Sequence, residues 1–84
     1  MTTTENAPNI HVDRMLDATG LACPLPILKT KAALAKMQLG EVLHVLATDP
    51  LAPLDFRAFC ISTKHELVHS IEADKRFEFF IRKG

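Results

Sequence analysis

The stretch Cys23-Pro24-Leu25-Pro26 holds the residues of this chain best suited to chemistry. It precedes a predicted helix, and a cysteine at a helix N-terminus is favoured as a thiolate by the free N–H groups and the helix dipole. Pro24 and Pro26 suit the first helical turn, where a missing N–H costs no hydrogen bond. Thiolates in such places have pKa values of about 3.5–7.5, against about 8.5 for free cysteine. The pattern therefore predicts a nucleophilic Cys23, supported by Pro24 and Pro26.

The other cysteine and the histidines favour structural roles. Cys60 falls at helical spacing with Phe56 and Phe59, which is typical of a core stripe. His65 and His69 lie four residues apart, but at the start of a predicted strand that spacing separates them by more than about 12 Å. We therefore expect Cys60 in the core and no metal site.

The composition predicts one small domain. The chain has 84 residues, two cysteines and equal numbers of acidic and basic residues. We expect a disordered tail over residues 1–9 and a domain over residues 10–84. The start of the chain has no apolar run and no stretch approaches the roughly 20 apolar residues of a membrane span. The expected location is the cytoplasm, and zero net charge gives no indication of direct nucleic-acid binding.

Hydrophobic periodicity predicts the order β-α-β-α-β-β. Strands are expected over Ile10–Leu16, Glu41–Thr48, Glu66–Glu72 and Arg76–Arg82, with helices over Pro24–Gln38 and from Pro50–Leu54 to Thr63. Right-handed crossovers then bring both helices to one face of the sheet. The predicted fold is an α+β two-layer sandwich with two helices on a four-stranded mixed sheet.

The first predicted helix has two apolar stripes. The bulkier one should face the sheet and contains Ile27, Thr30, Leu34 and Met37. Leu25 and Leu28 would then be exposed beside Cys23, with Lys29 as a basic edge. Exposed apolar groups next to a reactive centre are typical of docking surfaces, so we interpret Leu25, Leu28 and Lys29 as a partner site. The alternative for Lys29 is that it belongs to an ordinary solvent-exposed helix face with no binding role.

Several short motifs, in this order and at this chain length, resemble the TusA/SirA-like sulfur-carrier family. The resemblance covers about residues 12–84. It rests on Leu16-Asp17, Gly20-Leu21, Cys23-Pro24-Leu25-Pro26, Gly40-Glu41, Thr48-Asp49-Pro50, Phe59-Cys60, His65-Glu66-Leu67 and Phe79-Phe80-Ile81-Arg82-Lys83.

The resemblance implies a sulfurtransferase that carries sulfur as a persulfide on Cys23, with no cofactor. It implies a donor such as a cysteine desulfurase or a rhodanese-like protein, and an acceptor of the DsrE/TusBCD-like type. Family members that serve tRNA thiolation often have an acidic residue where this chain has Leu25. The sequence thus favours sulfur oxidation or general sulfur transfer. A relay to tRNA 2-thiouridine synthesis and a non-catalytic binding module remain as alternatives.

Overall fold

The protein is described by a computed structural model that covers residues 10–84. The predicted tail, residues 1–9, lies outside the described residues. The elements run in the order β1 (Arg14–Ala18), α1 (Leu25–Ala35), β2 (Val42–Ala47), α2 (Ala52–Ser62), β3 (Glu66–Ala73) and β4 (Arg76–Arg82). Their order and type confirm the sequence prediction.

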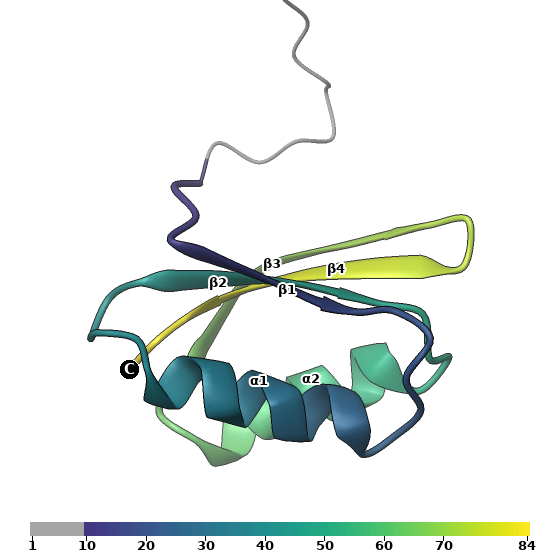
Figure 1. The fold of residues 1–84 in the computed structure, drawn as a ribbon, viewed down its shortest axis with the longest axis horizontal. Coiled ribbons are helices and arrows are strands. Elements are labelled where there is room, and N and C mark those ends of the chain that lie inside the picture. Colours follow the sequence, from purple (N-terminus) through teal and green to yellow (C-terminus); the bar gives the residue numbers. More distant parts are fainter. Residues whose placement is uncertain (1–9) are drawn as a thin grey trace, which may run out of the picture.

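The four strands form one mixed sheet in the order β1-β2-β4-β3. β1 runs parallel to β2, whereas β4 pairs antiparallel with both β2 and β3. Both helices cover the same face of this sheet, and within residues 10–84 no helix covers the opposite face (Figure 1). The predicted two-layer α+β sandwich is therefore confirmed.

The core lies between the helices and the inner face of the sheet. The Phe56 ring of α2 stacks on Phe79 of β4 with ring centroids 4.3 Å apart. Thr30 and Leu34 of α1 are buried, as is Met37 just after the helix, and Ile27 packs against the core. Because the helix turns its bulkier stripe inward, as predicted, Leu25 and Leu28 face solvent.

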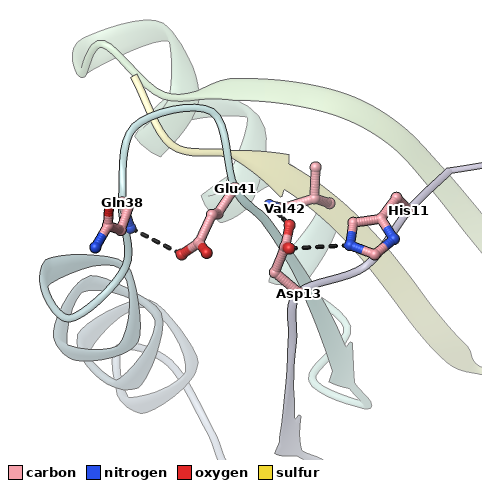
Figure 2. Close-up of polar contacts among 5 residues, drawn as sticks. All are labelled: His11, Asp13, Gln38, Glu41 and Val42. Atoms are coloured by element: carbon pink, nitrogen blue, oxygen red, sulfur yellow. Dashed lines mark hydrogen bonds and ion pairs between the residues drawn. The ribbon is translucent and has the colours of Figure 1, made fainter.

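The first strand begins and ends later than the predicted Ile10–Leu16. Its pairing with β2 starts at Arg14 opposite Leu43 and ends at Ala18 opposite Ala47. Asp13 marks the start, because its carboxylate accepts hydrogen bonds from the His11 ring at 3.0 Å and from the Val42 N–H at 2.9 Å (Figure 2). Alternation alone did not reveal this register, which the neighbouring strand sets.

The first helix ends at Ala35, earlier than the predicted Gln38. The Lys83 ammonium group donates hydrogen bonds to the carbonyl groups of Leu34 and Met37, each at 2.8 Å, and so caps this end. A cation favours the negative end of the helix dipole. The predicted helix-ending Gly40 instead has a φ of +88° in the turn into β2, where the Glu41 carboxylate accepts the Gln38 N–H (Figure 2).

Phe80 lies on the face of the sheet opposite the two helices, yet it is only 4% exposed. The His44 ring stacks on it at 4.2 Å and His69 lies 6.0 Å away. The Glu78 Oε1 atom lies within hydrogen-bond distance, 2.8 Å, of the His44 Nε2 atom. Two histidines thus lie against an aromatic ring on the face opposite α1 and α2.

Thr30 gives a test of core packing. Its side chain is fully buried, and its hydroxyl oxygen has no hydrogen-bond partner among the described residues. A buried unpaired hydroxyl costs about 1–3 kcal/mol. We expect Thr30→Val to raise the free energy of unfolding by about 1 kcal/mol, measured by urea denaturation. A lower stability for Thr30→Val would mean that the hydroxyl does find a partner.

Candidate functional site

The site is located where the two parallel strands end. Since β1 and β2 are parallel, their carboxyl ends lie at the same edge of the sheet, and each strand is followed by a helix (Figure 1). This edge is the usual place for function in sheets with parallel strands. Cys23 lies in the segment between β1 and α1, and Asp49 lies in the segment between β2 and α2.

Hydrogen bonds hold the first of these segments in place. Asp17, near the end of β1, accepts hydrogen bonds from the Thr19 N–H at 3.0 Å and the Thr19 hydroxyl at 2.7 Å. Both bonds lower the pKa of the exposed Asp17 carboxyl. Gly20 follows with a φ of +81°, and its N–H donates to the Thr48 hydroxyl at 2.9 Å. The turn is therefore anchored to the end of β2.

Cys23 itself is bound to the second segment. Its backbone N–H donates a hydrogen bond to the Asp49 carboxylate at 3.0 Å. Its thiol is free of any disulfide and exposed to solvent. This arrangement presents a sulfur atom at the surface on a backbone that is fixed from both sides.

The two prolines start the helix as predicted, one position later than expected. Pro24 is the N-cap residue, Leu25 begins α1, and Pro26 is buried in the first turn. The peptide bond between Cys23 and Pro24 is cis. Because Pro24 is the N-cap residue, Cys23 lies one position before the N-cap, outside the helix.

Two carboxylates surround the sulfur, which the sequence did not predict. The Cys23 Sγ atom and one oxygen each of Asp49 and Asp55 lie within 4.8 Å of one another. Asp55 lies in the first turn of α2, far from Cys23 along the chain. Within the described part of the chain, this is the cluster of His, Cys, Asp and Glu side chains whose atoms could bind a metal ion.

The carboxylates reverse the expected electrostatics of the thiol. A hydrogen bond to Asp55 raises the pKa of Cys23 most, and desolvation and the charges of Asp55 and Asp49 raise it further. The prediction of a low pKa from the helix N-terminus is therefore wrong. The dipole contributes about half a positive charge, whereas two carboxylates have oxygen atoms within 4.8 Å of the sulfur.

The exposed leucines form a larger surface than the sequence indicated. Leu25 is 45% exposed and Leu28 is 51% exposed, and Lys29 is also exposed. The start of α2 adds Leu51 and Leu54, which are exposed as well. Periodicity had indicated only the leucines of α1, because the proximity of the two helix starts follows from the sheet topology.

Cys60 lies apart from this chemistry. It is half-buried against the hydrophobic core, and burial raises the pKa of its thiol to about 11. Cys60 was predicted in the core beside Phe56 and Phe59; the structure places it at the edge of that core, partly buried against it. His65 stacks on Phe59 at 5.7 Å between ring centroids, and His69 lies against Phe80.

Comparisons with known proteins agree with this geometry. Residues 14–83 match the model of the family described as "Sulfurtransferase TusA". The chain belongs to the TusA sulfurtransferase family. It is 52% identical to the sulfur carrier protein TusA of Allochromatium vinosum over 72 residues, which cover 86% of this chain and 95% of that protein.

Two further relatives support the family. A Neisseria meningitidis protein provisionally named as a sulfur carrier is 57% identical over 67 residues, covering 80% of this chain and 90% of the relative. The crystal structure of a SirA-like protein from Desulfitobacterium hafniense has a TM-score of 0.75 and 26% identity. That alignment covers 86% of this chain and 99% of the solved chain. Within residues 10–84, no helix has the length and apolar character needed to cross a membrane.

Proposed function

We propose that this TusA family member is a sulfur carrier that accepts sulfane sulfur on Cys23 and passes it to a second protein. The donor in this proposal is a cysteine desulfurase or a rhodanese-like protein, and the acceptor is of the DsrE/TusBCD-like type. The proposed setting is cytoplasmic sulfur oxidation or general sulfur transfer. The protein acts as a carrier that is loaded and discharged, with no bound cofactor.

The single observation that carries this proposal is the presentation of Cys23. Its sulfur is exposed, while its backbone is held by Asp49 and followed at once by a proline-started helix. A cysteine with only a packing role has no need of such a position, since free cysteines are usually buried. An exposed thiol on a fixed loop can meet the reactive sulfur of one protein and then that of another.

Loading requires little catalytic machinery from this chain. The ionised Cys23 sulfur attacks the terminal sulfur of a donor persulfide, and the donor leaves as a thiolate. The reaction conserves the number of sulfur–sulfur bonds and needs no oxidant. Since the chemistry is a simple exchange, selectivity must come from docking surfaces such as Leu25, Leu28 and Lys29.

The same relay could instead feed tRNA 2-thiouridine synthesis. The apolar Leu25 between the two prolines favours the other pathways, as the sequence comparison with family members implied. A non-catalytic regulatory module is the alternative from another class. It predicts no sulfur on Cys23 after exposure to a persulfide donor.

Replacement of the carrier thiol tests the proposal. We expect Cys23→Ser to abolish loading by polysulfide, measured by intact-protein mass spectrometry, while the thermal transition stays at the wild-type temperature. Cys60→Ala is the matched control and should load normally, with a loss of about 1 kcal/mol in stability because it truncates a half-buried side chain. Normal loading of Cys23→Ser would contradict the assignment.

A second prediction concerns the docking surface. We expect Leu28→Glu to load normally from inorganic polysulfide but to slow sulfur transfer from a protein donor by about tenfold, which corresponds to about 1.4 kcal/mol of lost binding. Leu39→Glu is the matched control, because Leu39 is 78% exposed and follows the opposite end of α1. Stopped-flow or quenched transfer assays measure both. Equal slowing by the two variants would contradict a local docking site at Leu28.

A further inference from the structure

The carboxylates of Asp49 and Asp55 give the sulfur an anionic environment. Their oxygens and the Cys23 Sγ atom lie within 4.8 Å of one another. Asp49 is held there by the N–H of Cys23 itself, at 3.0 Å. A thiolate or a persulfide anion at Cys23 would stand next to two further negative charges, and like charges at this distance disfavour ionisation.

Exposed leucines lie close to these carboxylates along the chain. Leu25 and Leu28 lie in α1, Leu51 is the N-cap residue of α2 two positions after Asp49, and Leu54 precedes Asp55 in α2. Clustered exposed apolar side chains beside a charged centre are typical of a surface that binds another protein. The counter-charge for Asp49 and Asp55 is therefore expected from a protein that docks on these leucines.

We propose that the partner that fits this surface presents a lysine or arginine side chain next to its own reactive sulfur, and that this cation pairs with Asp49 and Asp55 and so allows Cys23 to ionise. The proposal rests on the proposed sulfur-carrier function, whose partner it specifies. Asp49 and Asp55 are positioning residues in this scheme. The free carrier keeps its thiol protonated and becomes reactive only in the correct complex.

The charge distribution supports this assignment. The hydrogen bond to Asp55, with desolvation and the charges of Asp55 and Asp49, holds the pKa of Cys23 above its ordinary value. Asp55 belongs to α2 and Asp49 to the segment before it, and these are the charged groups that act on the thiol. A docked cation within about 4–6 Å acts in the opposite direction. Exclusion of water by the leucines strengthens that effect.

The transfer step balances with these groups. The docked cation lets the Cys23 thiol release its proton to water, and the resulting thiolate forms a bond to the terminal sulfur of the donor persulfide. The sulfur–sulfur bond of the donor breaks, and its departing thiolate takes up a proton from water. The net change converts the Cys23 thiol and a donor persulfide into a Cys23 persulfide and a donor thiol.

Small disulfides of different charge test the proposal without a protein partner. The full-length protein is treated, in the presence of EDTA, with cationic cystamine, neutral bis-hydroxyethyl disulfide or anionic dithiodipropionate. The rate of mixed-disulfide formation at Cys23 is measured by mass spectrometry with peptide mapping. After correction for the rates with a free model thiol, we expect cystamine to react about tenfold faster than the anionic disulfide, the effect of one unit of pKa.

Carboxylate variants then locate the source of that preference. Asp49→Asn and Asp55→Asn should each reduce it, and Asp55→Asn should also move the alkylation profile of Cys23 to lower pH. Asp55→Glu should restore the preference because it restores the charge. Glu72→Gln is the control, since Glu72 is exposed on β3 and is not among the groups that act on Cys23.

The outcomes separate this inference from the proposed function. Equal corrected rates for the three disulfides, or an unchanged preference in both asparagine variants, would overturn the inference even if Cys23 loads with sulfur normally. A charge preference that depends on Asp49 and Asp55 would support it whether or not persulfide loading succeeds. Thermal melts of every variant confirm that the compared proteins are folded.

Discussion

The hydrogen bond from the Cys23 N–H to the Asp49 carboxylate is the contact on which the rest of the site depends. It joins the segments that follow two parallel strands, and it is possible only because β1 and β2 end at the same edge of the sheet. The bond fixes the backbone that carries the sulfur. It also brings one negative charge next to that sulfur, and Asp55, which raises the pKa of Cys23 most, adds a second from α2.

The negative charges next to the sulfur change the pKa that a position before a helix N-terminus would lead one to expect for Cys23. A cysteine before a helix is expected to ionise easily, because the dipole contributes about half a positive charge. Here a hydrogen bond to Asp55, desolvation and the charges of Asp55 and Asp49 raise the pKa of Cys23. An exposed thiol that stays protonated resists reaction with stray electrophiles. In the proposed function, this property would favour loading of Cys23 by specific partners only.

Features that depend on a local pattern of residues could be predicted from the sequence. Periodicity predicted all six elements, the inward stripe of Thr30, Leu34 and Met37, and the exposure of Leu25 and Leu28, because burial repeats with the geometry of a helix or a strand. The bounds of β1 and the end of α1 were missed, since Asp13 and Lys83 set them through contacts with distant segments.

The electrostatics of the site could not be predicted in the same way. In the sequence, Asp49 is part of the Thr48-Asp49-Pro50 motif and Asp55 falls in the second predicted helix, and nothing local marks either as a neighbour of Cys23. Their positions beside Cys23 follow from the packing of α2 next to α1, which no local pattern reveals. The opposing effects of dipole and carboxylates could be compared only when the three groups were placed together.

Mapping of sulfane sulfur on the wild-type chain tests the central claim most directly. The protein is exposed to a cysteine desulfurase with cysteine, alkylated, digested, and its peptides are analysed by mass spectrometry with and without prior reduction. The account predicts added, reducible sulfur on the peptide that contains Cys23 and none on the peptide that contains Cys60. Sulfur on Cys60 alone, or an unmodified Cys23 under conditions that load another carrier, would contradict it.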